Sequence, residues 1–103
     1  MSGEYDVALE YYNRALAIKL KSLPAEHPDV AMTYKNMGLV YEVKDELEQA
    51  LPLLQKASSI YQAALPSNHP NVTKIIKDVE RVEDKMKKRQ GSAMKDMKKK
   101  TKK

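Results

Sequence analysis

The chain repeats itself at an interval of 42 residues, and this repeat constrains its fold more than any other feature. The segment LPAEHPDV, which begins at Leu23, returns as LPSNHPNV, which begins at Leu65. Between residues 3–44 and residues 45–86, twelve positions are identical, and both the apolar positions and the loop residues are kept. A period of this length is typical of arrays in which each unit packs only against its neighbours. We therefore expect a stack of similar units.

The repeated loops divide the chain into helices. Proline lacks an amide hydrogen and disfavours a helical residue before it, so each Leu-Pro pair ends a helix and each His-Pro pair begins the next. No stretch alternates apolar and polar residues in the way that a half-buried strand does. The sequence therefore predicts an all-α fold of antiparallel helix-turn-helix repeats. The predicted helices are residues 4–23, 28–43, 46–65 and 70–89.

Small and apolar residues mark the faces on which these helices pack. Tyr34, Met37 and Tyr41 are spaced by three and four residues, which places them on one face of the second helix. Gly38 lies beside this face, and because glycine costs a helix about 1 kcal/mol relative to alanine, it indicates a closely approaching neighbour. The third helix has small residues on its own packing face. The predicted repeat core consists of Tyr34, Met37, Gly38, Tyr41, Ala50, Leu54 and Ala57.

The pattern Tyr34-x-x-Met37-Gly38-x-x-Tyr41, followed by Ala50-x-x-x-Leu54-x-x-Ala57, resembles the tetratricopeptide repeat. The longer period and the His-Pro-Asp-Val-Ala loop make it similar to the extended repeats of kinesin light chains and nephrocystin-like proteins. The resemblance covers residues 3–86. It implies a non-catalytic adaptor for protein–protein interaction, with a kinesin-light-chain-like role in cargo recognition.

In that family the first helix of each unit lines a concave groove that binds extended peptides. The resemblance therefore implies a groove with asparagine and basic residues along two helices. An asparagine can both donate and accept a hydrogen bond with a peptide group, and basic side chains favour acidic ligands. A solvated helix face is the alternative for the same positions. The candidate peptide-binding residues are Lys35, Asn36, Leu39, Lys74, Lys77 and Arg81.

The two ends of the array are predicted to differ. In the fourth helix, Glu80 and Glu83 replace the residues that match Gly38 and Tyr41, and a single apolar stripe remains. Such a stripe with polar flanks is what a terminal capping helix needs.

In the first helix, Ala8, Tyr12 and Ala15 align with the packing face of the third helix, but the helix that would cover them is missing. Because about three repeats are usually needed for stability, we expect a truncated array or self-association through the first helix. A piece of a longer repeat protein is a further possibility.

The net charge of +5 is unevenly distributed. From Lys85 to the end the chain has ten basic residues and one acidic residue, a charge of +9, whereas residues 1–84 carry −4. We expect the repeat domain to span residues 1–89 and a disordered basic tail to span residues 90–103, because like charges repel and little apolar surface can be buried there. Such a tail is compatible with binding nucleic acid, anionic lipid or an acidic protein surface, with nuclear import, or with no specific partner.

Several classes of function have no support in the sequence. There are no cysteines, and the two histidines, His27 and His69, occupy equivalent turns before proline. A metal site needs several converging ligands, and no nucleophile arrangement or phosphate-binding loop stands out. We expect no enzymatic activity, no metal and no cofactor. Without a secretory signal or an apolar run long enough to span a membrane, a reducing, cytoplasmic setting is the expectation.

Overall fold

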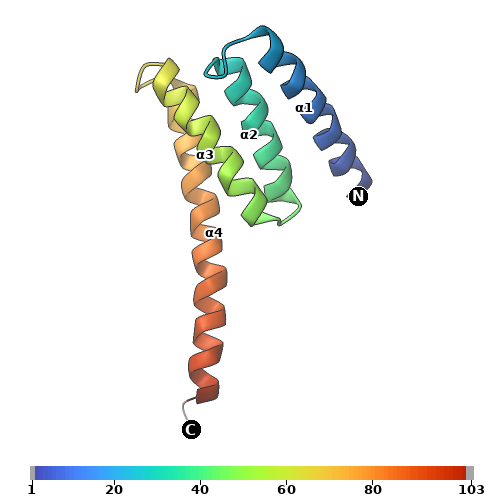
Figure 1. The fold of residues 1–103 in the computed structure, drawn as a ribbon. Helices are drawn as coiled ribbons and strands as arrows, with labels where there is room; N and C mark the ends of the chain where they lie inside the picture. The colour runs from blue at the N-terminus through green and yellow to red at the C-terminus, as the bar shows by residue number, and fades with distance from the viewer. Residues whose placement is uncertain (1, 102–103) are drawn as a thin grey trace.

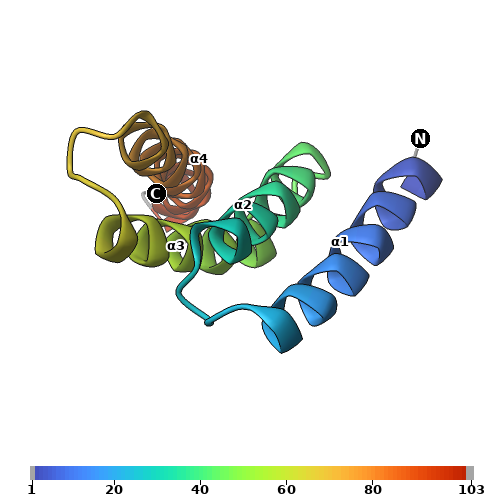
Figure 2. The ribbon, with the colours of Figure 1, turned by 90° about the horizontal axis from the view of Figure 1, so that it is seen from above.

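Consecutive helices pack side by side and form the whole fold. The structure is a computed structural model that describes the backbone of residues 2–101 and the side chains of residues 3–91. Its helices are α1 (Ser2–Ser22), α2 (Pro28–Val43), α3 (Leu47–Ala64) and α4 (Pro70–Thr101). Helix α1 packs against α2, α2 against α3, and α3 against α4, and Figures 1 and 2 show α1 at one end of this series. Residues 2–101 contain no strand, so the all-α prediction is confirmed.

The two Leu-Pro…His-Pro loops have the same hydrogen bonds. The backbone N–H of Asp29 donates to Nδ1 of His27 at 3.0 Å, and the N–H of Asn71 donates to Nδ1 of His69 at 3.0 Å. Each imidazole therefore satisfies one of the amide groups that the first turn of a helix leaves without a partner. The repeated His-Pro pair thus caps α2 and α4 and fixes where both helices begin.

The core lies mainly between α2 and α3. A Cβ atom at Gly38 would lie 2.8 Å from Cγ of Leu54 and 3.2 Å from the carbonyl oxygen of Ala50. The absence of a side chain at Gly38 is therefore what lets the two helices approach. Of the seven predicted core residues, five are buried, whereas Tyr34 and Tyr41 are partly buried and pack against the core.

Helix α4 covers the other side of α3 with the apolar stripe that the sequence predicts. Val72, Ile75 and Val82 are buried, and Ile76, Val79 and Met86 pack against the core.

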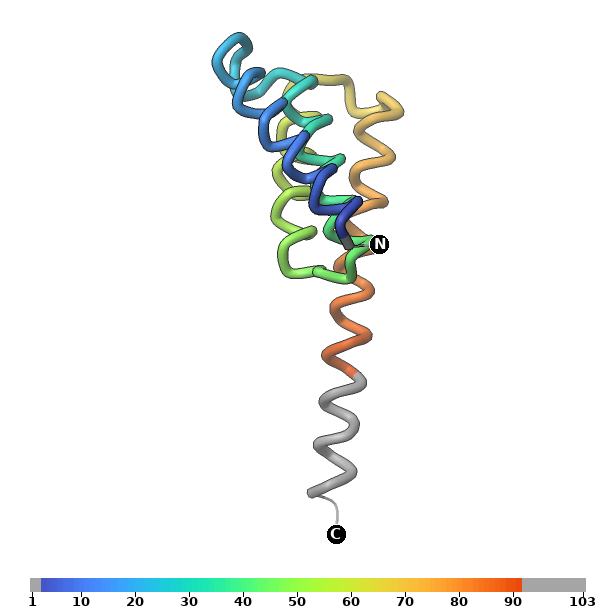
Figure 3. The backbone as a smooth tube through the Cα atoms, turned by 90° about the vertical axis from the view of Figure 1, so that its right-hand side faces the viewer, coloured from blue at the N-terminus to red at the C-terminus, as the bar shows by residue number. Residues whose placement is uncertain are grey.

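The C-terminal end of α4 differs from the prediction. The sequence predicts a last helix over residues 70–89, followed by a disordered tail over residues 90–103, whereas α4 continues to Thr101. A glycine inside a helix costs only about 1 kcal/mol, and alanine, methionine and lysine, which favour helix, are frequent after it. Lys102 and Lys103 lie outside the described residues. Figure 3 shows that α4 already projects beyond the turn between α2 and α3 before residue 91.

Helix α1 is attached less deeply than the others. Within residues 3–22 only Leu9 is buried, and Leu16 packs against the core from a partly buried position. Two polar contacts add to this packing: Nζ of Lys44 lies 2.9 Å from Oδ1 of Asp6, and Nζ of Lys19 lies 3.0 Å from Oγ1 of Thr33. Hydrogen bonds to Asp6 and Glu46 raise the pKa of Lys44.

Candidate peptide-binding face

The candidate residues lie on two helices that the structure brings together. On α2, Lys35 and Leu39 belong to the same row as Glu42, because residues three and four apart share a helix face. On α4, Lys74 and Lys77 belong to the same row as Arg81. Glu42 contacts Arg81 directly, so the two rows meet at this end of the face.

Exposure differs along these rows. Lys35, Asn36 and Leu39 are partly buried, and Leu39 packs against the core, whereas Lys74 and Lys77 are exposed.

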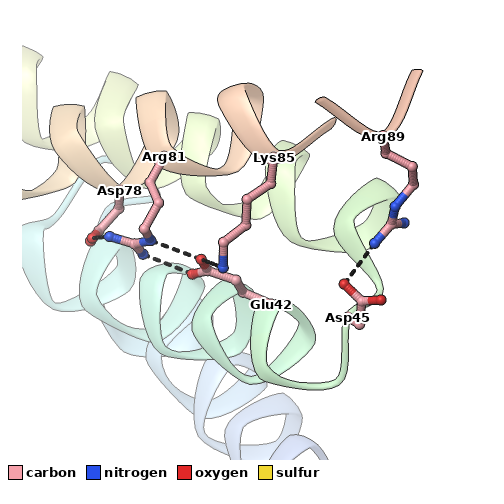
Figure 4. Close-up of polar contacts among 6 residues, drawn as sticks. All are labelled: Glu42, Asp45, Asp78, Arg81, Lys85 and Arg89. Carbon is pink, nitrogen blue, oxygen red and sulfur yellow. Dashed lines mark hydrogen bonds and ion pairs between the residues drawn. The ribbon is translucent and has the colours of Figure 1, made fainter. Parts of the chain in front are cut away.

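An ion-pair network joins α2 to α4 at one end of this face (Figure 4). Arg81 donates two hydrogen bonds to the carboxylate of Glu42, at 2.8 and 2.7 Å, and a third to Asp78 at 2.8 Å. Lys85 donates to the same carboxylate at 2.7 Å, and Arg89 pairs with Asp45 at 2.6 Å. A bidentate arginine–carboxylate pair of this kind is directional and stronger than a single neutral hydrogen bond.

The network keeps Glu42 ionised although its side chain is only 8% exposed. Hydrogen bonds from Arg81 lower the pKa of Glu42 more than burial raises it, and Lys85 lowers it further, to about 2. The same carboxylate raises the pKa of Arg81. Because its guanidinium already contacts Glu42 and Asp78, Arg81 differs from the other candidates: it fastens α4 to α2.

Glu42 is a member of this face that the sequence does not predict. The spacing of three residues between Asp78 and Arg81 is visible in the sequence and predicts a contact on one helix. Glu42 is 39 residues from Arg81, and no local pattern identifies that pair.

Apolar side chains complete the face on α2. Met32 is 43% exposed and Val43 is 62% exposed, and both follow the spacing of Leu39 along the helix. Asn36 lies within this apolar row. The arrangement can hold an apolar side chain, hydrogen-bond a peptide group and attract a carboxylate.

The described part of the chain has neither a candidate metal site nor a candidate membrane-spanning helix. Within it, no group of three or more histidine or acidic side chains could hold a metal ion. None of its helices combines the length and apolar character needed to span a bilayer.

The fold is that of a helical-repeat protein, a class whose members generally serve as adaptors for protein–protein interaction. The tetratricopeptide repeat family matches residues 1–63, more than half of the sequence, and the chain belongs to this family. Its repeats are of the kinesin light chain type, which confirms the prediction made from the residues.

That type is seen in a solved structure. The crystal structure of nearly identical TPR-like repeats from a Podosopora anserina protein assigned as a kinesin light chain matches with a TM-score of 0.68 and 25% identity. The match covers 79% of this chain and 38% of the other, so the chain spans well under half of that protein's length. No curated protein matches the chain.

Proposed function

We propose that the chain binds an extended, acidic peptide segment of a partner protein on the face formed by α2 and α4. The observation that carries this proposal is the contact between two unlike rows. The row of Lys35 and Leu39 on α2, with Asn36 beside it, and the row of Lys74 and Lys77 on α4 meet at the Glu42–Arg81 ion pair. The exposed apolar side chains beside Asn36 favour a ligand that also carries an apolar residue. Cargo recognition of the kinesin light chain kind is the biological role that this binding would serve.

The ion-pair network gives the basic residues of the face two different roles. Because Glu42 engages Arg81 and Lys85, the charge contacts to a ligand fall to Lys35, Lys74 and Lys77. Arg81 then acts as a positioning residue that keeps the two rows together. An acidic ligand that contacted Arg81 would compete with a carboxylate that is already in place.

Fluorescence anisotropy with synthetic peptides tests the proposal on the full chain. Three labelled peptides of equal length are compared, each with one central apolar residue and either acidic, neutral or basic flanks. We expect the acidic peptide to bind most tightly. Asn36→Ala and Lys77→Ala should each weaken it by about 5- to 30-fold, since a hydrogen bond to or from a charged or peptide group contributes about 1–2 kcal/mol.

Lys21→Ala is the matched control, because Lys21 is an exposed lysine on α1, away from this face. It should leave the affinity unchanged. Equal binding of all three peptides, or loss caused by Lys21→Ala but not by Lys77→Ala, would contradict a specific groove.

The basic end of the chain supports a second candidate function, the binding of a polyanion. The charge of +9 from Lys85 onward is the observation that favours it. Deletion of Ser92–Lys103 separates the two candidates. Peptide binding that survives the deletion and moderate salt favours the α2–α4 face, whereas binding that is lost and falls steeply with salt favours the tail.

A further inference from the structure

The outer face of α1 carries an uncovered stripe of four side chains. Val7, Tyr11 and Ile18 are 67%, 68% and 65% exposed, and the side chain of Arg14 is 76% exposed. Their spacings of four, three and four residues place them on one face of the helix. Glu10 borders the stripe, and a surface hollow of about 360 Å³ lies against Val7, Glu10, Tyr11 and Arg14. Large exposed apolar side chains grouped in this way mark a surface for a partner.

The internal repeat shows what kind of side chain covers such a stripe. Arg14 corresponds to Lys56, which is 42 residues further on, in α3. Nζ of Lys56 lies 5.2 Å from the centre of the ring of Tyr34 on the neighbouring helix α2. A cation at this register of the repeat therefore packs against an aromatic ring of the helix that covers it. The structure gives Arg14 no such ring from a covering helix within the described residues.

We infer that this stripe is the contact surface for a second copy of the chain, with the two α1 helices antiparallel about a two-fold axis. The stripe is self-complementary when two copies of it lie antiparallel. An axis between Tyr11 and Arg14 sets Val7 against Ile18 of the second copy and Tyr11 against Arg14 of the second copy. An arginine over a tyrosine ring is a favourable contact, and the symmetry supplies it twice.

The charges select this orientation over the parallel one. In the described structure Arg14 pairs with Glu10 of the same helix at 2.6 Å. A parallel pair would set Arg14 against Arg14 and Glu10 against Glu10, which is repulsive. In the antiparallel pair, Arg14 of one copy faces Tyr11 of the other copy, and Glu10 precedes that tyrosine in the sequence. Opposite charges of the two copies therefore lie near each other.

Helix α4 of a second copy is a worse occupant of the same stripe. Helix α2 packs on α3 at Gly38, and Tyr41 packs against the core. The equivalent positions of α4 are Glu80 and Glu83. Docking α4 on α1 would bury these carboxylates against an apolar surface, which is costly without partners. A head-to-tail chain of copies is therefore disfavoured, and a closed dimer is favoured.

The association should be weak because a single pair of helix faces buries little surface. We expect a dissociation constant on the order of 10–500 µM. Sedimentation velocity of the full 103-residue chain over a concentration series up to about 1 mM measures it. The expected result is a reversible shift from monomer to dimer; a chain that remains monomeric throughout this series overturns the inference.

Charge substitutions in the stripe test the orientation. Ile18→Lys and Val7→Asp should each weaken the dimer by at least about tenfold, because each buries a charge against an apolar side chain. The double variant Val7→Asp/Ile18→Lys should recover much of the affinity, since an antiparallel pair sets each aspartate against a lysine. Circular dichroism of each variant verifies that α1 is still folded, which is expected because both side chains are mostly exposed.

Ala63→Lys is the control, since Ala63 is an exposed apolar residue on α3 and belongs to neither the stripe nor the peptide-binding face. It should leave the dimer unchanged. A dimer that tolerates both single substitutions in α1, or a double variant that is weaker than either single variant, overturns the antiparallel arrangement. Neither result depends on the peptide-binding face.

Discussion

At the residue scale, Gly38 controls how closely α2 and α3 approach. A methyl group there would lie under 3 Å from the buried side chain of Leu54 and 3.2 Å from the backbone oxygen of Ala50. Gly38→Ala gains about 1 kcal/mol of helix propensity, but overpacking of this kind costs about 1–3 kcal/mol. We expect a net loss of about 1 kcal/mol in the free energy of unfolding, measured by urea denaturation.

Gly91→Ala is the control for this substitution. Gly91 also lies inside a helix, and a Cβ there would meet nothing within 4 Å. The propensity gain should then appear without the packing cost, so this variant should be as stable as the parent or up to about 1 kcal/mol more stable. A Gly38→Ala variant that is stabilised as much as Gly91→Ala would show that the helices are free to separate.

Tyr61 shows what spacing alone does not reveal at this scale. Its position on the packing face of α3 follows from the helical period, and the residue is 1% exposed. Its hydroxyl oxygen has no hydrogen-bond partner within the described residues, and burial, together with the charge of Asp29, raises its pKa. The period identifies which side chains are buried, but the partners of a buried polar atom depend on residues distant in sequence.

At the element scale, Glu42 joins α4 to α2, and this contact predicts an acid-dependent loss of stability. The pKa of Glu42 is about 2 in the folded chain, against an ordinary value of 4.5. The unfolded chain therefore takes up a proton first as the pH falls. The stabilisation by this carboxylate is complete above about pH 5 and is lost between about pH 5 and pH 2, with an amplitude of about 2–3 kcal/mol. Urea denaturation at a series of pH values measures it.

Glu42→Gln isolates this contribution from that of the other carboxylates. The variant should be less stable than the parent by about 2–3 kcal/mol at pH 7, and the difference should vanish near pH 2. Glu10→Gln is the control, because Glu10 pairs with Arg14 on an exposed helix surface, where such pairs contribute less than about 1 kcal/mol. An equal effect of the two substitutions, or a difference that does not change with pH, would contradict this role of Glu42.

The first residues of the helices could be predicted well, because they depend on residues that are adjacent in the sequence. The prolines at 28 and 70 fix the first residues of α2 and α4, because proline suits the first helical turn. The end of α4 could not be predicted, since Gly91 is compatible with both a helix end and a helix interior. The candidate face was predicted only in part: the rows on each helix follow from the period, whereas the Glu42–Arg81 pair depends on how the two helices pack.

At the scale of the whole molecule, the excess of positive charge is confined to the C-terminal part of the chain, which begins within α4. The charge of +9 begins at Lys85, in α4, and the first basic residues of that segment, Lys85 and Arg89, pair with Glu42 and Asp45. The acidic helices and the basic end of α4 are therefore connected by ion pairs. The basic character of the whole chain is accordingly a poor guide to the ligand of the α2–α4 face.

The uneven burial across the molecule also predicts the order in which it opens. Helix α3 has seven buried residues, whereas within residues 3–22 of α1 only Leu9 is buried. Regions with few buried apolar contacts open with a smaller free energy than the core. In hydrogen exchange at low chain concentration, amides in the middle of α1 should exchange at least about tenfold faster than those of α3, a difference of about 1.4 kcal/mol or more.

Lys44→Met tests whether the polar contact at the turn between α2 and α3 helps to hold α1 in place. It removes the bonds of Lys44 to Asp6 and Glu46 while keeping an apolar stem, so exchange in α1 should become faster and exchange in α3 should not change. Raising the chain concentration should slow exchange in α1 selectively, because an α1-mediated dimer protects α1 first. Identical exchange free energies in α1 and α3 would mean that the molecule opens as one cooperative unit, in which the shallow burial of α1 has no separate consequence.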